Sequence, residues 1–414
     1  MRRALLTLGL AALLSACGQL TRQATERPEE APAHEPLHAA VDRLVRPVLD
    51  AHETPGLIVG VATPDGRRHF FAYGSGETRG APLGPDTQFP IGSLTKGYVA
   101  ALLAVLVDEG TLRWDDTLAD LLPTLQTTPE AARLTLLQLA THQAGLPRQP
   151  TTLSMLTGLM RFTFTGSNFY GGLDAAGIAR FMAGFKPPAA PEPAYSNLGY
   201  ALIGMAIEAR TGRRLDALLA EKVLTPLDLR HTGFQPDSAH RAQGHAGDQP
   251  YFMPRGRPVR DWRFPAAMQG SAALYSTASD LLSFAVAHVD ASSDALHAQL
   301  ADNLRVRHAQ PQDAPGIAWV TDDVDSTPIT NQVGMAVGHT AYVGVQREQR
   351  LAVVVLQTSF NWNFKIGHRL LLRLARGQID TTGDGLEVSA QTPGGPAPII
   401  AAARQDGQPA PAMP

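Results

Sequence analysis

The sequence predicts an α/β fold in which an antiparallel sheet, formed by the N- and C-terminal parts and covered by helices, carries an inserted, mainly helical lobe. Helix and hairpin patterns occur near the start, helical patterns fill the middle, and strand and helix patterns return near the end. The two ends can share one sheet if the middle is an insertion. With 414 residues, 44% of them apolar, the chain can bury a large core.

The N-terminal elements are a helix and a hairpin. The segment 37–52, "LHAAVDRLVRPVLDAH", predicts an amphipathic helix because its apolar residues share one face: Leu37, Val41, Leu44, Val45 and Val48. The segment that follows, "GLIVGVATPDGRRHFFAYGSG", contains two strand-like runs on either side of Thr63-Pro64-Asp65-Gly66. This turn signal predicts a β-hairpin.

The middle of the chain predicts helices. The apolar run "KGYVAALLAVLVDEG" follows Ser93 and ends at Gly110, and "LTLLQLATHQAGL" and "NLGYALIGMAIEARTG" have similar character. We expect the last of these to end at Gly212. A further helix in "YSTASDLLSFAVAHV" has Ser276 or Thr277 as its N-cap. The inserted lobe is therefore predicted at about 93–269.

Two strands and a helix are predicted near the C-terminus. The segment 333–359, "VGMAVGHTAYVGVQREQRLAVVVLQTS", resembles two antiparallel strands that turn at Arg347 to Arg350. The segment "FKIGHRLLLRLARG" then predicts a closing helix.

The first 17 residues predict a lipoprotein signal peptide. Arg2 and Arg3 precede an apolar run, 4–14, and Leu-Ser-Ala-Cys follows. The run is shorter than the about 20 residues that span a bilayer, and it fits an export signal. Because Leu-Ser-Ala-Cys resembles the bacterial lipobox, we expect an exported protein that Cys17 anchors by lipid to the cell envelope, facing the periplasm or the cell exterior. An ordinary signal peptide with an incidental cysteine is the alternative.

Composition sets the remaining boundaries. Residues 18–36 are polar and rich in Pro and Glu, which predicts a flexible tether, and 379–414 are rich in Gly, Pro and Ala, which predicts a disordered tail. The folded domain is thus predicted at 37–378. Cys17 is the single cysteine, so no disulfide can form within the chain. A net charge of -3 gives no electrostatic case for nucleic acid as a partner.

The stretch "FPIGSLTK" carries the first chemical signal. If Ser93 begins a helix, Lys96 lies one turn further on the same face, about 5–6 Å away between Cβ atoms. A serine hydroxyl needs a base to become a nucleophile, and a buried, neutral lysine amine can serve as one. The free amides of a helix start can stabilise an oxyanion, which makes the Ser93 amide the first candidate donor. The alternative is a serine N-cap followed by an exposed lysine.

Two later motifs supply candidate partners. Tyr195-Ser196-Asn197 follows a Pro-rich stretch and precedes a helix, so Tyr195 can share a proton with Lys96 and Asn197 can orient Lys96 or a substrate amide. The sequence from His339 to Tyr342 lies in a predicted strand beside the cleft. There the strand edge offers main-chain groups to a substrate, and the Tyr342 amide is the candidate for the second oxyanion donor.

The order of these motifs resembles the serine β-lactamase and penicillin-binding-protein superfamily, and more narrowly its class C β-lactamase branch, which includes DD-carboxypeptidases and esterases. The stretches "LTLLQLATHQAGLP", "PAYSNLGYALIG", "GSAALYSTASDLLSF" and "LAVVVLQ" agree in family order. The resemblance implies a β-lactamase/transpeptidase-like fold with Ser93 as the acylated nucleophile, Lys96 as its proton partner and Tyr195 as the general base. Asn197 then contacts substrate and lysine. The resemblance also places His339 and Thr340 in the family's Lys/His-Thr-Gly motif.

One departure concerns that last motif. The family usually has glycine where this chain has Ala341, and His339 stands where a lysine would give a permanent charge. Recognition of a substrate carboxylate is therefore in question. Before the Tyr motif, the segment 153–174, rich in Gly, Thr and aromatic residues, predicts either a wall of the cleft or an ordinary core segment.

Three functions remain open. The first is a cell-envelope serine hydrolase acting on D-Ala peptides of peptidoglycan, as a DD-carboxypeptidase, or on β-lactams. The second is a carboxylesterase acting on small acyl esters with the same residues, and the third is a non-catalytic binding or sensor lipoprotein. No metal or cofactor is expected, because the one zinc-like pattern, His34-Glu35-Pro36-Leu37-His38, has Pro36 inside the helical turn it requires.

Overall fold

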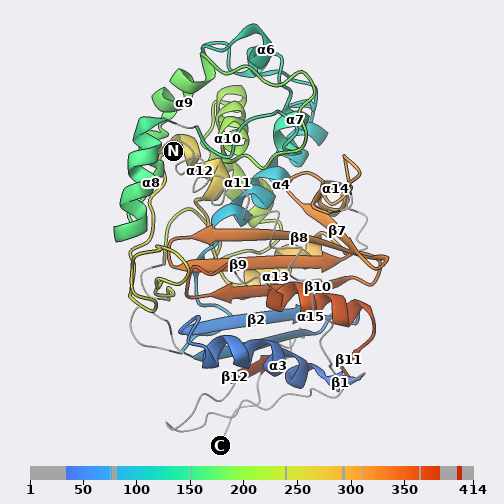
Figure 1. Ribbon diagram of the computed structural model, residues 1–414. Coiled ribbons are helices and arrows are strands. Elements are labelled where there is room, and N and C mark those ends of the chain that lie inside the picture. Colours follow the sequence, from blue (N-terminus) through green and yellow to red (C-terminus); the bar gives the residue numbers. More distant parts are fainter. Residues whose placement is uncertain are drawn as a thin grey trace, which may run out of the picture.

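The computed structural model describes residues 34–74, 76, 82–150, 152–237, 240–290, 294–310, 312–362, 365–382 and 399–402. Cys17 and most of the predicted tether lie outside these residues. The architecture is an α/β arrangement in which a large sheet lies below a helical lobe (Figure 1).

The N- and C-terminal parts of the chain form one antiparallel sheet, as predicted. Its order is β12-β3-β2-β10-β9-β8-β7-β6. The central pairing joins the two ends: Ile58 of β2 stands opposite Leu356 of β10. The strands are β2 (Gly56–Ala62), β3 (Arg68–Gly74), β6 (Ala314–Pro315), β7 (Val320–Val324), β8 (Thr327–Ala336), β9 (His339–Gln346), β10 (Leu351–Gln357) and β12 (Ile399–Ala402).

Helices cover both faces of this sheet. On one face, α3 (Leu37–Asp50) and α15 (Lys365–Ala375) pack through apolar residues such as Val41, Val45 and Leu370. On the other face, α13 (Ala278–Ala287) lies between the sheet and the lobe. The predicted first helix, the hairpin at 63–66 and the closing helix are confirmed, and Thr277 is the N-cap of α13.

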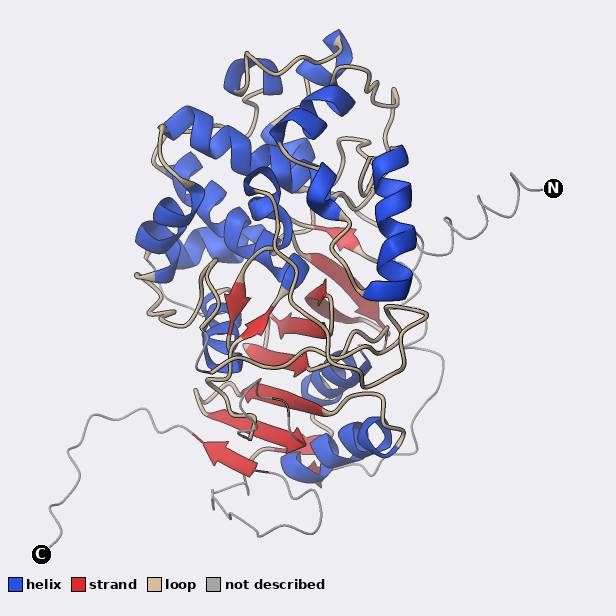
Figure 2. Cartoon of the chain, turned by 90° about the vertical axis from the view of Figure 1, so that its left-hand side faces the viewer, coloured by secondary structure: helices blue, strands red, loops and turns tan. Residues whose placement is uncertain are grey.

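The lobe between β3 and β6 is mainly helical (Figures 1 and 2). Its long α10 ends at Gly212, whose φ of 66° suits a glycine C-cap. Its helices are α4 (Thr95–Asp108), α5 (Leu118–Leu121), α6 (Pro129–Ala132), α7 (Leu136–Ala140), α8 (Leu153–Thr165), α9 (Ala175–Met182), α10 (Asn197–Thr211), α11 (Leu215–Leu219) and α12 (Gln269–Ala272), and α14 (Ala295–Asn303) follows α13. Short turns of helix are η1 (Gly92–Leu94), η2 (Tyr170–Gly172), η3 (Ala220–Leu224) and η4 (Ala266–Met268), and β4 (Phe89–Pro90) pairs with β5 (Tyr275–Ser276).

The structure adds strands that the sequence analysis did not predict. β6, β7 and most of β8 lie in a stretch without a clean apolar alternation. At the domain boundary, β1 (Glu35–Pro36) pairs with β11 (Ile379–Asp380), so ordered structure begins inside the predicted tether and continues past 378. β12 pairs with β3 inside the segment 379–414, for which the sequence predicts a disordered tail. None of the helices in the described part of the chain is both long and apolar enough to span a bilayer.

Candidate active site

Ser93 and Lys96 lie at the junction between η1 and α4, directly above the sheet. Lys96 Nζ is 3.3 Å from Ser93 Oγ. The turn requires Gly92, because its φ is 52° and a Cβ there would lie 2.4 Å from the carbonyl oxygen of Met335. The predicted one-turn spacing therefore produces a direct contact, and close backbone packing fixes the serine in place.

The environment of Lys96 suits a base. The residue is 1% exposed, and Nζ donates to Asn197 Oδ1 at 2.8 Å and to the Ser271 carbonyl oxygen at 2.7 Å. Both of these partners only accept hydrogen bonds, so they use two of the N–H groups. The remaining position on Nζ, toward Ser93, holds either a third proton or a lone pair. When it holds the lone pair, Lys96 can take the proton of the Ser93 hydroxyl.

Tyr195 and Asn197 lie at the start of α10, in agreement with the helix that the sequence predicts after them. The ring of Tyr195 lies under the amine, with Lys96 Nζ 4.7 Å from the ring centroid. Ser196 is the N-cap, since its Oγ accepts the Gly199 amide at 3.0 Å. Asn197, 2% exposed, accepts from Lys96 and donates to the hydroxyl of Tyr170 at 3.0 Å. Tyr170 had not been predicted; it is a buried polar neighbour that links η2 to this group.

His142 positions the Tyr195 motif from α7's C-terminal end. Its Nδ1 accepts the Ser196 amide at 3.2 Å, and its carbonyl oxygen accepts the Ala194 amide at 2.9 Å. The ring is 4.8 Å from the Tyr195 ring. Because burial disfavours the charged form and Lys96 and Arg148 add repulsion, the pKa of His142 is lowered to about 3. His142 is thus a neutral positioning residue at ordinary pH.

This depressed pKa gives a pH-dependent stability. The unfolded chain binds a proton at His142 near pH 6.5, whereas the folded chain binds it only near pH 3. The contribution of His142 to the free energy of unfolding is therefore fully present above pH 6.5 and is lost as the pH falls toward 3. At pH 5 the loss is about 2 kcal/mol. His142→Gln keeps an acceptor for Ser196 but cannot titrate. Urea unfolding should show that the free energy of unfolding falls less between pH 7.5 and pH 5 in this variant than in the wild type. An equal fall in both proteins would contradict the lowered pKa of His142.

β8, not β9, runs beside Ser93. A Cβ at Gly334 would lie 2.0 Å from the carbonyl oxygen of Ile91, and one at Gly92 would lie 2.8 Å from the Met335 amide nitrogen. The pairing of β7 with β8 ends at Asn331, so within the described residues the main chain of 332–336 faces η1 on that side. The Met335 amide therefore replaces the Tyr342 amide as the candidate second donor, together with the amide of Ser93.

The roles predicted for His339, Thr340, Ala341 and Tyr342 are corrected by this placement. β9 is an interior strand: Tyr342 stands between Val333 and Val355, so its main chain is engaged in the sheet. Its ring lines part of the cavity but packs under α15, where a Cβ at Gly367 would lie 2.2 Å from it. Ala341 faces the α13 side within the core and does not line the cavity, so its methyl group does not crowd Ser93.

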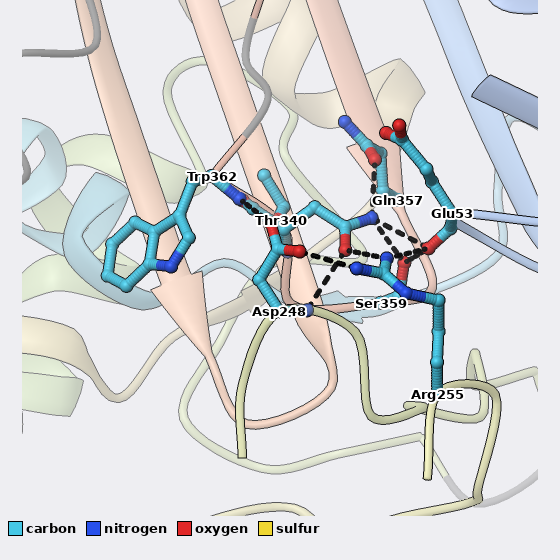
Figure 3. A network of polar contacts seen from close by, with 8 residues as sticks. Glu53, Asp248, Arg255, Thr340, Gln357, Ser359 and Trp362 are labelled. Atoms are coloured by element: carbon cyan, nitrogen blue, oxygen red, sulfur yellow. Dashed lines mark hydrogen bonds and ion pairs between the residues drawn. The ribbon is translucent and has the colours of Figure 1, made fainter. Parts of the chain in front are cut away.

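His339 and Thr340 have structural surroundings. The buried His339 ring packs edge-on to Phe89, with Nε2 3.7 Å from Asp261 Oδ1. Thr340 Oγ1 accepts the Asn361 amide at 3.0 Å and belongs to a polar network that ties β9 and β10 to the loop at 248–255 (Figure 3). This network includes Glu53, Asp248, Arg255, Gln357, Ser359 and Trp362.

Gln332 takes the position beside Ser93 that the sequence had assigned to His339. Its side chain lines the cavity, and a Cβ at Gly97 would lie 2.8 Å from its Nε2. Gln332 is 6% exposed, and Nε2 has no hydrogen-bond partner among the residues that the structure describes. A buried amide with a free donor beside Lys96 is a candidate substrate contact. Gln332 is neutral, so this position supplies no charge for a substrate carboxylate.

The cavity above Ser93 has a volume of about 660 Å³ and mostly apolar walls. α8 provides one wall through Met155, Leu156, Leu159 and Phe162. The segment 153–174 therefore contributes a wall of the cleft, and its buried residues Met155, Phe162, Tyr170 and Leu173 also belong to the hydrophobic core. Across the described residues, no group of three or more His, Cys, Asp or Glu side chains is placed to hold a metal ion.

Comparisons with known proteins agree with this geometry. The family model described as Beta-lactamase matches residues 41–376. Penicillin-binding protein 4 of Amycolatopsis lactamdurans is 29% identical over 71% of this chain and 78% of its own length. The D-alanyl-D-alanine-carboxypeptidase/endopeptidase AmpH of Escherichia coli K12 is 27% identical over 61% of this chain, a match that spans 62% of that relative.

Among solved structures, the class C beta lactamase from Rhodobacter sphaeroides has a TM-score of 0.68 at 22% identity and covers 81% of this chain and 99% of its own. This likeness concerns the fold.

Proposed function

Because this chain belongs to the Beta-lactamase family, we propose that it is a cell-envelope serine hydrolase that forms an acyl-enzyme at Ser93, with peptidoglycan D-Ala peptides or β-lactams as substrates. The observation that carries the proposal is the 3.3 Å contact between Lys96 Nζ and Ser93 Oγ in a buried pocket. Relatives named as a penicillin-binding protein and as a D-alanyl-D-alanine carboxypeptidase support this substrate class.

The chemistry follows from the geometry. Ser93 Oγ attacks the carbonyl carbon while its proton passes to Lys96 Nζ, and the amides of Ser93 and Met335 stabilise the oxyanion. When the C–N bond breaks, the leaving amine takes the proton that Lys96 Nζ received from Ser93. A water molecule then attacks the Ser93 ester, releases the acyl group as the acid and restores the Ser93 hydroxyl.

Ester hydrolysis is the second candidate function, and the character of the pocket favours it. Its walls are mainly apolar, and the strand beside Ser93 presents the neutral Gln332. The same nucleophile and base would act on a small acyl ester. A non-catalytic sensor has no comparable support, because Ser93, Lys96, Tyr195 and Asn197 lie together in one pocket.

Attachment to the membrane belongs to the same proposal. The lipobox-like sequence ends at Cys17, and the first described residue is His34. An extended linker reaches roughly 3.3 Å per residue, so the 17 steps from Cys17 to His34 would span up to about 56 Å. Metabolic labelling with an azide-bearing fatty acid should mark the wild-type protein but not Cys17→Ser.

Intact-mass spectrometry tests the acyl-enzyme. After exposure to a penicillin, the protein should gain the mass of one intact penicillin, and Ser93→Ala should gain nothing. Comparing hydrolysis of a D-Ala-D-Ala peptide with hydrolysis of p-nitrophenyl butyrate then separates the two enzymatic functions. Turnover of the ester without the peptide and without a penicillin adduct would replace the first candidate by the second.

Gln332 provides a test of the strand assignment. Gln332→Ala should lower kcat/KM about tenfold, the effect of one lost hydrogen bond to substrate. Thr340→Val, in the neighbouring strand, should leave kcat/KM almost unchanged and lower the free energy of unfolding by about 1–2 kcal/mol, because Asn361 loses its partner. If Thr340→Val lowered kcat/KM and Gln332→Ala did not, β9 rather than β8 would be the strand that binds the substrate.

A further inference from the structure

The outer surface of α8 carries an unusual concentration of apolar side chains. In the described part of the chain, Val306 is the one exposed large hydrophobic residue outside this region. The others form what we call the α8 apolar face: Leu153, Leu156, Met160, Phe164, Tyr251 and Phe252. Their exposures range from 38% for Leu156 to 78% for Leu153. Clustered exposure of this kind marks an interaction surface.

The α8 apolar face is formed by one side of α8 and a loop that packs against this helix. The four α8 residues are spaced by three, four and four positions, so they form one stripe along the helix. The loop at 251–252 extends the stripe, because the Phe252 amide donates to the Thr163 carbonyl oxygen at 2.8 Å and the Phe252 ring stacks on Phe164 at 4.5 Å. α8 itself stands at the outer edge of the helical lobe (Figure 1).

A cationic hollow borders this face. It has a volume of about 420 Å³ and lies between the C-terminal end of α8 and the segment 257–262. Its lining includes the exposed Arg161, Arg257 and Arg260, none of which forms an ion pair with any residue that the structure describes. The one acidic residue of the lining, Asp261, is already paired with Arg241 at 2.8 Å. The hollow therefore offers three uncompensated guanidinium groups.

We propose that the α8 apolar face and the arginine hollow dock onto an anionic phospholipid surface. Leu, Met and aromatic side chains insert at the boundary between headgroups and acyl chains, and arginines beside them bind headgroup phosphates. The charge is complementary only locally, since the whole chain carries a net charge of -3. Leu156 belongs both to this face and to the cavity wall, so docking brings the cavity next to the membrane.

The single cysteine makes a site-specific test possible. In full-length Cys17→Ser, a cysteine introduced as Met160→Cys is labelled with the environment-sensitive dye NBD, and Val306→Cys is the matched control, exposed but outside the face. Vesicles with 40% phosphatidylglycerol should shift the emission of the dye at 160 to shorter wavelength and increase its intensity about threefold. The dye at 306 should not respond, and phosphatidylcholine vesicles should give less than a third of the effect.

The arginine hollow is tested on the same labelled protein. Arg257→Glu with Arg260→Glu should weaken binding to phosphatidylglycerol vesicles at least tenfold, whereas Arg213→Glu with Arg214→Glu, an equal charge change elsewhere, should weaken it less than twofold. An unresponsive dye at 160, an equal response at 306, or equal binding to both vesicle types would overturn the proposal. A response at 160 to peptidoglycan fragments without lipid would instead assign the face to a cell-wall partner and also overturn it.

Discussion

Ser93→Ala is expected to abolish covalent labelling and to lower kcat/KM by at least about 10³-fold, because the substitution removes the hydroxyl that lies 3.3 Å from Lys96 Nζ. The residual rate would come from substrate binding and the amides of the oxyanion site. Labelling by a fluorescent penicillin or a fluorophosphonate, followed by intact-mass analysis, measures the loss. Ser93 is the middle residue of the short helical turn η1 and has an intermediate exposure, so the substitution should leave the thermal midpoint within a few degrees of the wild type.

Ser279→Ala is a matched control, since Ser279 lies on α13 away from the cavity. It should label as the wild type does. Labelling of Ser93→Ala at the wild-type rate would mean that another residue is the nucleophile, and the catalytic assignment would then be wrong.

Lys96→Met is expected to slow acylation about 10³-fold or more, because Ser93 would lose the group that takes its proton. The substitution also removes the donor to Asn197 Oδ1 and to the Ser271 carbonyl oxygen. Two buried acceptors left without a donor should lower the free energy of unfolding by about 2–4 kcal/mol. Stopped-flow acylation and urea unfolding separate the two effects.

Lys222→Met is the matched control for Lys96→Met, because it removes a lysine that lies away from Ser93. Lys222 forms a surface pair with Glu109 at 2.7 Å, so Lys222→Met should change stability by less than about 1 kcal/mol and leave acylation unaltered. Acylation of Lys96→Met that rises with pH in parallel with hydroxide would support loss of a general base. Acylation at the wild-type rate would show that Lys96 is not the base.

The sequence was sufficient to predict the β2–β3 hairpin, the pairing of β9 with β10 and the contact between Ser93 and Lys96, because these depend on local signals. An amphipathic pattern, a hairpin turn and a three-residue spacing each act over a few positions. Ser93 and Lys96 meet through one turn of helix, which needs no knowledge of the rest of the fold. Tyr195 and Asn197 were singled out because they precede a predicted helix and because the order of the motifs resembles a known family.

The assignment of the strand beside Ser93 failed for a physical reason. The letters Gly-His-Thr stand at the start of β9, but whether β8 or β9 lies against η1 depends on the tertiary approach of Gly334 to Ile91. β8 also carries Pro328, Asn331 and Gln332, which interrupt the apolar alternation that marks a strand. Tyr170 was missed because nothing in its local sequence shows that Asn197 will reach its hydroxyl.

The central position of β2 has a consequence for biogenesis. Gly56 and Thr358, 302 positions apart, are joined by a hydrogen bond at 3.0 Å, and β2 has β10 as its inner neighbour. During synthesis, the hairpin of β2 and β3 must wait with one edge and one apolar face unsatisfied until nearly the whole chain has left the ribosome. A chain with this topology therefore stays unfolded until its synthesis is nearly complete, and it is open to holding chaperones during that time.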